Sequence, residues 1–292
     1  MKSNRIKDWA KRIRKHLTFN ILGSATLMFF SLLLLVPLIW VFYSSFKDAF
    51  VFRNDHFGLP TVWIFDNYIQ SYTAISVKVN KSTYNLLGLF FNSLYYTLLY
   101  DIIPLSGATM VAYGCARYKS SFGKIFYNLV VISIVTPIMG GLSSSLDISR
   151  TLGIWDKVLP SAIFQMYPRG MAFLVLYSTF LGIDKGYSEA AFIDGAGHWQ
   201  VFLTIMVPLA KNILGVYLVT GFISYWNDWQ TALVWFPSSP TLSYGLYRAQ
   251  SNISSIPIIF AACIVAMLPV LIMFVLFREK IIGKLSFGGL KG

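Results

Sequence analysis

Ionisable side chains within long apolar stretches are the first candidates for chemistry in this sequence. Asp101, Arg169 and Asp228 each lie inside such a stretch. A charged residue in the middle of a membrane helix costs about 2.5–3.5 kcal/mol on insertion scales, so each is a functional candidate. Two of them also have a simpler interpretation. Asp228 could be an interfacial residue beside Trp226 and Trp229, and Arg169 could be an anchor at a helix mouth.

The sequence does not contain the residue patterns of catalytic, nucleotide or metal sites. Gly123–Lys124 and Gly283–Lys284 lack the glycine five positions earlier that a phosphate-binding P-loop requires. The three histidines, His16, His56 and His198, are too scattered for a metal site. We therefore expect a protein that is not an enzyme, with no catalytic residue, metal or cofactor. Any energy from ATP must come from another chain.

The composition indicates a membrane protein. Of the 292 residues 56% are hydrophobic and only 12% are charged, against about 25% in ordinary soluble domains. The net charge of +12 lies in short basic clusters at the ends of apolar runs, which suits anionic lipid headgroups and not nucleic acid. Cys115 and Cys263 lie in apolar surroundings and are expected to be small buried side chains.

The apolar runs predict six transmembrane helices. Their expected bounds are 17–46, 86–112, 125–146, 158–182, 213–233 and 257–277. Pro160 and Pro168 suggest a bend or break near the start of the fourth span. Residues 47–81 are predicted to form an ordered external loop, and residues 147–157 a shorter external segment. Because the basic clusters concentrate on one side, that side, with both termini, is predicted to be cytoplasmic.

Between the fourth and fifth spans lies a short amphipathic segment, residues 188–208, which faces the cytoplasm by this count. Gly195 and Gly197 divide it, so we expect a helix, a tight turn and a second helix. Ser188 is the predicted N-cap of the first helix, and Glu189 lies in its first turn. Its apolar side chains are expected to form one face. These are Ala191, Phe192, Trp199, Phe202, Leu203 and Met206.

This segment resembles the EAA loop of the integral-membrane subunits of bacterial ABC importers. The matching residues are Glu189, Ala190, Ala191, Asp194, Gly195, Ile205 and Pro208, and the form with Asp194 is similar to the sugar-importer branch related to the maltose permease. Further similar stretches are Ala112–Tyr113 with Ala116–Arg117, Trp226–Asn227–Asp228, and the tail from Gly283 to Gly292. On either side of this segment the chain departs from the family pattern, at residues 183–187 and at Asn212, where a proline commonly stands.

The resemblance implies a fold, a function and partners. It implies an all-α polytopic membrane protein with a cytoplasmic basic N-terminus (1–16), a six-span permease domain (17–282) and a cytoplasmic tail (283–292). The chain would be a multi-pass subunit in a bacterial plasma membrane, importing a sugar or oligosaccharide. Its partners would be a homologous permease subunit, a cytoplasmic ATPase dimer carrying ATP and Mg²⁺, and an extracytoplasmic solute-binding protein.

The resemblance also implies roles for particular residues. In that family the EAA loop docks into a cleft of the ATPase, and the tail adds Lys291 and Gly292 as candidate contacts. The expected substrate path contains Asp101, Arg169, Trp226, Asn227 and Asp228. Asp101 and Arg169 fall near the middle of their spans, so they could pair with each other or face an aqueous cavity.

Two other interpretations remain open. An ordinary interfacial helix between two spans would share the amphipathic pattern of residues 188–208 without touching an ATPase. An ion-coupled secondary transporter acting without an ATPase is the functional alternative, although the internal repeat typical of that class is not evident in the sequence.

Overall fold

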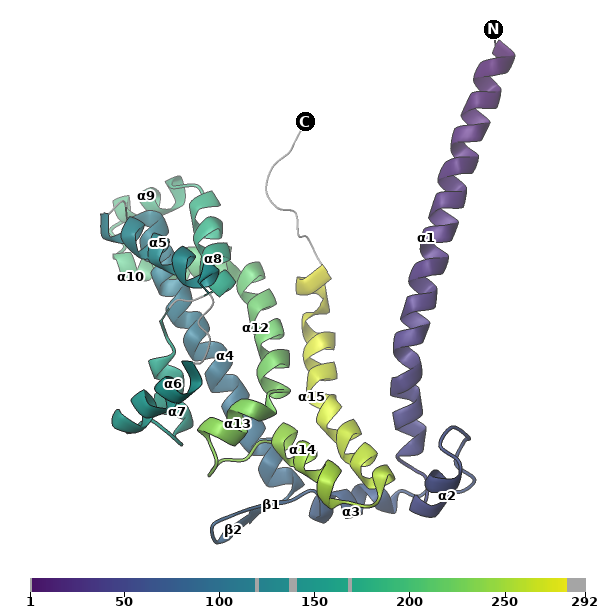
Figure 1. Ribbon diagram of the computed structural model, residues 1–292. Coiled ribbons are helices and arrows are strands. Elements are labelled where there is room, and N and C mark those ends of the chain that lie inside the picture. Colours follow the sequence, from purple (N-terminus) through teal and green to yellow (C-terminus); the bar gives the residue numbers. More distant parts are fainter. Residues whose placement is uncertain (1, 119–120, 137–140, 168–169, 283–292) are drawn as a thin grey trace. The chain divides into compact units, whose positions relative to one another are not determined.

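The computed structural model describes residues 2–118, 121–136, 141–167 and 170–282. The described chain is mainly helical (Figure 1). It divides into two compact units. The first takes in the chain up to Ser71 together with Ile253–Ile264. The second takes in Tyr72–Asn252 and the chain from Val265 onward. It contains residues 188–208, and it also contains Asp101.

In the first unit, helix α1 (Lys2–Ser44) is followed by the short helix α2 (Ala49–Asn54), and helix α3 begins at Asp66 and ends at Ala74. The buried ring of Phe46 packs against Trp63, Phe65 and Tyr68. The connecting loop is therefore ordered, as the sequence predicted.

Lys47 is an unusual member of this unit because its side chain is only 1% exposed. Its Nζ donates a hydrogen bond to the carbonyl oxygen of Asp55 at 2.8 Å and lies within 6 Å of the ring centres of Tyr43 and Phe52. Asn67 donates to the carbonyl oxygens of Ser45 and Lys47. These bonds satisfy the backbone where α1 ends, which fixes the start of the loop.

In the second unit, the long helix α4 (Leu86–Arg117) confirms the predicted second span and extends it by five residues to Arg117. The side chain of Asn85 caps it by accepting the N–H of Gly88. A hairpin of strands β1 (Val77–Val79) and β2 (Ser82–Tyr84) precedes it. The prediction of an all-α protein is thus wrong for this short stretch, where Asn80 adopts the positive φ of 52° that a tight hairpin turn uses.

The predicted third and fourth spans are each interrupted. Residues 125–146 fall on helix α5 (Ser121–Val135) and the beginning of helix α6 (Gly141–Thr151), which also takes up part of the expected external segment. Helix α5 ends two residues before Pro137, where a proline disfavours helical backbone in the preceding residue. The expected break in the fourth span is present, between helix α7 (Val158–Phe164) and helix α8 (Gly170–Gly182).

The amphipathic segment consists of helix α9 (Gly186–Ile193), helix α10 (His198–Val201), the π-helical turn η1 (Phe202–Met206) and the single turn α11 (Val207–Leu209). Helix α12 (Lys211–Trp226) follows after a bend of 74°. The predicted fifth span is interrupted, because Asp228 caps a new helix, α13 (Trp229–Trp235). Helices α14 (Leu242–Asn252) and α15 (Ile256–Ile282) complete the described chain.

Three described helical segments are long and apolar enough to cross a membrane, namely Asn20–Ser44, Leu86–Arg117 and Ile256–Phe277. The bent pair His198–Leu209 and Lys211–Trp226 would add a fourth. Helices α5 and α8 are apolar but shorter. The chain is therefore a multi-pass membrane protein.

Candidate functional site

The EAA segment, as we call residues 188–208, lies at the C-terminal end of α4 (Figure 1). The predicted helix, turn and second helix are present. Helix α9 ends at Ile193, and the chain reverses at Gly195, whose φ is +82°. The N–H of Ala196 donates to the carbonyl oxygen of Ala191 at 2.9 Å, which closes the turn. Glycine is favoured here because a Cβ atom makes this backbone conformation costly.

Contacts with α4 and α8 hold this segment in place. Val201, Phe202 and Met206 are buried in a cluster that includes Tyr113 and Phe180. Arg117 donates a hydrogen bond to the carbonyl oxygen of Ile183 at 2.8 Å, and Tyr118 Oη lies 2.9 Å from His198 Nδ1. Arg117 and Tyr118 therefore position the segment, a role that the sequence analysis did not assign to either. The sequence feature that could have indicated this role is their position directly after a long apolar run.

The opposite surface of the segment is exposed. Ile193 is 86% exposed and Trp199 60%, and Leu203 is also accessible. The predicted single apolar face is therefore wrong, because Phe202 and Met206 point inward while these side chains point outward. Among the predicted coupling residues, Glu189, Ala190, Asp194, Gly195 and Pro208 are exposed, and Ala191 and Ile205 are half-buried. Lys291 and Gly292 lie outside the described residues.

Ser188 is not the N-cap of α9, which begins two residues earlier. Asp184 Oδ1 accepts the N–H of Gly186 at 2.7 Å and so satisfies a backbone donor at the helix start. Ser188 is 8% exposed, and its hydroxyl has no hydrogen-bond partner in the described part of the chain. It lines a cavity of about 510 Å³ together with Arg117, Lys185 and Glu189.

A second cavity, here called the central cavity, lies between α4, α8 and α12, about halfway along α4. It has a volume of about 280 Å³. Asp101 is in its wall and is only 7% exposed. The remaining polar lining comes from tyrosine rings, hydroxyl groups and one amide. These residues are Tyr100, Gln165, Tyr167, Tyr217, Thr220, Ser224 and Tyr225. The cavity combines aromatic surface with hydrogen-bonding groups at the depth predicted for Asp101.

Asp101 lies very close to the backbone of α12. A Cβ atom at Gly221 would overlap Asp101 Oδ1, so the carboxylate needs a glycine at that position. Arg169 lies outside the described residues, and a pair between Asp101 and Arg169 therefore stays a prediction.

The other predicted substrate-path residues lie nearer the N-terminal end of α4. Asp228 caps α13 by accepting the N–H of Thr231 at 3.0 Å, and it also accepts a hydrogen bond from Tyr96. Trp226 is buried and donates to the carbonyl oxygen of Ala266. Asn227 is exposed and bonds back to Ile223 within its own helix. Each makes contacts that stabilise the fold, and their place in a substrate path remains a prediction.

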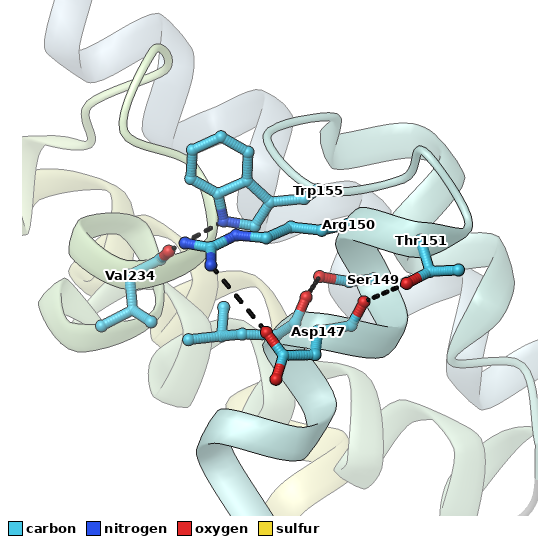
Figure 2. A network of polar contacts seen from close by, with 7 residues as sticks. Asp147, Ser149, Arg150, Thr151, Trp155 and Val234 are labelled. Atoms are coloured by element: carbon cyan, nitrogen blue, oxygen red, sulfur yellow. Dashed lines mark hydrogen bonds and ion pairs between the residues drawn. The ribbon is translucent and has the colours of Figure 1, made fainter.

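The connection between α6 and α7 is fixed by a polar network (Figure 2). The guanidinium of Arg150 lies over the ring of Trp155, 5.1 Å from its centre, and 4.0 Å from Asp147. Trp155 Nε1 donates to the carbonyl oxygen of Val234 on α13. Because α7 leads directly to Gln165, this network positions one wall of the central cavity.

Gln165 and Tyr167 also line a smaller neighbouring cavity of about 190 Å³, beside α6 and Trp235. The two cavities therefore share the wall formed where α7 ends. Across the described part of the chain, no group of three or more metal-ligating side chains comes together.

The comparisons with known proteins agree with this architecture. No protein-family model matches the sequence. The chain is 27% identical over 277 residues to a diacetylchitobiose uptake permease of Streptomyces coelicolor, covering 92% of this chain and 88% of that one. It is 27% identical over 287 residues to an arabinooligosaccharide transport permease of Bacillus subtilis, covering 94% and 98%.

A solved bacterial ABC transporter involved in the import of alginate shares the fold. One chain of it superposes with a TM-score of 0.73 at 22% identity, covering 89% of this chain and 95% of that one. The protein thus has the fold and sequence pattern of the membrane subunits of ABC importers. Among such subunits its relatives are carbohydrate permeases, which confirms the predicted resemblance to the maltose-permease branch.

Proposed function

We propose that this chain is a transmembrane permease subunit of an ATP-driven importer for a sugar or oligosaccharide. The observation that carries the proposal is its similarity to carbohydrate import permeases along about nine-tenths of its length. The solute arrives on an extracytoplasmic binding protein and crosses between this chain and a homologous permease subunit. A related alginate importer has been solved in complex with its substrate-bound periplasmic protein.

The chain has no catalytic role of its own in this proposal. A separate cytoplasmic ATPase dimer binds ATP and Mg²⁺ and supplies the energy. The EAA segment, residues 188–208, is its docking element. The exposed side chains of Glu189, Ile193 and Trp199 would contact the ATPase, and Lys291 and Gly292 in the tail would add to the contact.

Three architectural features support this coupling role. Gly195 makes a tight turn between two short helices, which presents a projecting surface. Arg117 and Tyr118 attach that surface to α4, which runs on to the central cavity. A displacement of the docked helices would therefore be passed to the cavity wall along α4.

The proposed topology has six crossings in the plasma membrane of a bacterium. Helices α1, α4 and α15 each form one crossing. Helix α5 with α6, α7 with α8, and α12 with α13 form the other three as interrupted spans. Non-helical backbone is tolerated at membrane depth where it is buried in protein or lines a cavity, which suits the break at Gln165. Residues 1–16, the EAA segment and residues 283–292 face the cytoplasm, around the permease domain of residues 17–282.

Site-directed cross-linking tests the coupling surface. A photoreactive residue is placed at Ile193 in the assembled transporter, and a matched one is placed at Ile148 on α6, which is also exposed, at 52%. We expect an adduct with the ATPase from position 193 and none from position 148. Equal labelling from both positions, or labelling from 148 alone, would contradict the assignment of residues 188–208.

A further inference from the structure

The central cavity contains a carboxylate that has no polar partner among the residues the structure describes. Asp101 is 7% exposed, and among the described residues no hydrogen bond or ion pair engages its side chain. A buried carboxylate without a partner is expensive, so such groups usually have a ligand or counter-charge. Asp101 lines the cavity of about 280 Å³, and a ligand there is within its reach.

The lining of the cavity indicates what kind of ligand fits. Tyrosine rings offer flat apolar faces and hydroxyl groups, and Thr220 and Ser224 add hydroxyls from α12. A pocket that pairs aromatic surface with a few polar groups suits a ring whose faces are apolar and whose edge carries hydroxyls. The volume lies near the lower end of the roughly 300–1,000 Å³ of small-molecule sites, so the cavity has room for about one sugar ring.

The charge of Asp101 adds a selection. A carboxylate accepts hydrogen bonds from hydroxyl donors, and such charge-assisted bonds are the stronger ones. The same group repels a second carboxylate or a sulfonate held nearby at low dielectric. The site would therefore favour neutral saccharides over acidic ones.

We propose that this cavity binds one neutral sugar unit during transport, that Asp101 accepts hydrogen bonds from its hydroxyl groups, and that the same carboxylate rejects acidic saccharides. This proposal rests on the proposed function and adds to it a substrate class and a specificity-determining residue. Gly221 has a supporting role, because a side chain there would push the carboxylate of Asp101 out of its position.

Binding to the purified membrane complex with its ATPase, without the solute-binding protein, isolates the selectivity of the cavity. The probes are a panel of neutral di- and trisaccharides and the uronic acid forms of the same saccharides, and the readout is the Kd. We expect the neutral member of a pair to bind about tenfold or more tightly than its acidic form. In Asp101→Asn, we expect neutral binding to weaken and the difference within the pair to shrink to less than about threefold.

The matched control is Asp48→Asn, which makes the same chemical change on an exposed carboxylate that belongs to the other unit of the chain and does not line the cavity. It should leave both Kd values unchanged. Gly221→Ala should resemble Asp101→Asn, since it displaces the same carboxylate. Equal binding of neutral and acidic saccharides to the unmodified complex would overturn the proposal without any variant having to fold.

Two further outcomes separate this proposal from others. If Asp101→Asn and Arg169→Gln each reduce folded protein and the double variant recovers it, the two residues pair and Asp101 is not a free acceptor. ATP-driven uptake by the full transporter tests the function itself. Uptake of saccharides without the charge selectivity overturns only the inference, whereas no saccharide uptake at all overturns the proposed function.

Discussion

Gly195 is the residue on which the geometry of the EAA segment most directly depends. Its φ of +82° lies in the region that L-residues avoid, and a Cβ atom there would meet no other atom within 4 Å. The free-energy cost of a substitution therefore comes from local backbone strain at a positive φ, and not from a clash with another residue. Gly197, two residues on, has an ordinary φ of −74° and an equally open Cβ position. The two glycines provide a matched pair.

Gly195→Ala should destabilise the turn by about 1–2 kcal/mol, and Gly195→Pro should abolish ATP-driven uptake, because proline fixes φ near −65°. The amount of protein in the membrane should stay normal in both variants, since the surrounding helices are unaffected. Uptake by proteoliposomes and immunoblots of membranes measure the two effects. Gly197→Ala is the control and should transport normally. Normal uptake by Gly195→Pro would show that this turn has no part in coupling.

Single residues also mark the limits of sequence reasoning. The turn in the EAA segment could be predicted, because Gly195 and Gly197 lie together between two amphipathic stretches. Ser188 was assigned the wrong role because Asp184 lies four residues upstream and satisfies the helix start instead. The close approach of Asp101 to Gly221 joins residues 120 positions apart, and no local pattern could predict it.

At the scale of elements, α4 runs from the hairpin end of the second unit to the EAA segment (Figure 1). Its middle part lines the central cavity. Two of its glycines have different surroundings. A Cβ atom at Gly107 would overlap the carbonyl oxygen of Met166, where the chain breaks between α7 and α8. A Cβ atom at Gly114 would meet nothing within 4 Å.

Gly107→Ala should therefore lower the stability of the folded protein by about 1–3 kcal/mol, the usual cost of overpacking, because backbone must move. Gly114→Ala, on the same helix, should be neutral or stabilising by up to about 1 kcal/mol through helix propensity. Thermal unfolding of the purified protein in detergent gives both values. Equal stabilities for the two variants would show that α4 does not approach the α7–α8 break so closely.

Asp228 marks the boundary between α12 and α13, and it is also a predicted substrate-path residue. Asp228→Ala should cost about 1–2 kcal/mol of stability, because it removes the cap of α13 and the bond from Tyr96. Asp228→Ser should retain most of that stability, since serine is also a good cap. Uptake by Asp228→Ser decides between the two roles. A stable Asp228→Ser protein that fails to transport would support a role in the substrate path.

Apolar runs could be located from hydropathy, but the breaks within them mostly could not. A span interrupted by a few residues keeps the average hydropathy of a continuous one, so α12 and α13 were predicted as a single helix. The break before α8 was anticipated only because Pro160 and Pro168 are visible in the sequence. Asn227 and Asp228 are polar residues that commonly end and begin helices. They indicate the break between α12 and α13, but averaging the hydropathy over a window hides it.

At the scale of the whole molecule, this chain is one subunit of a multi-subunit transporter and does not transport by itself. The sequence motifs already predicted this, because they match a family whose ATPase is a separate chain. The cavity between α4, α8 and α12 could not be predicted, because it depends on how three distant segments pack.

Uptake by reconstituted proteoliposomes tests this central claim most directly. The vesicles contain this chain with its permease partner and the ATPase, the solute-binding protein and labelled saccharide are outside, and ATP and Mg²⁺ are on the ATPase side. The account predicts accumulation that requires ATP, the ATPase and the binding protein together, with no ATP hydrolysis by this chain alone. Accumulation by vesicles that contain only this chain, driven by an ion gradient and independent of ATP, would contradict it.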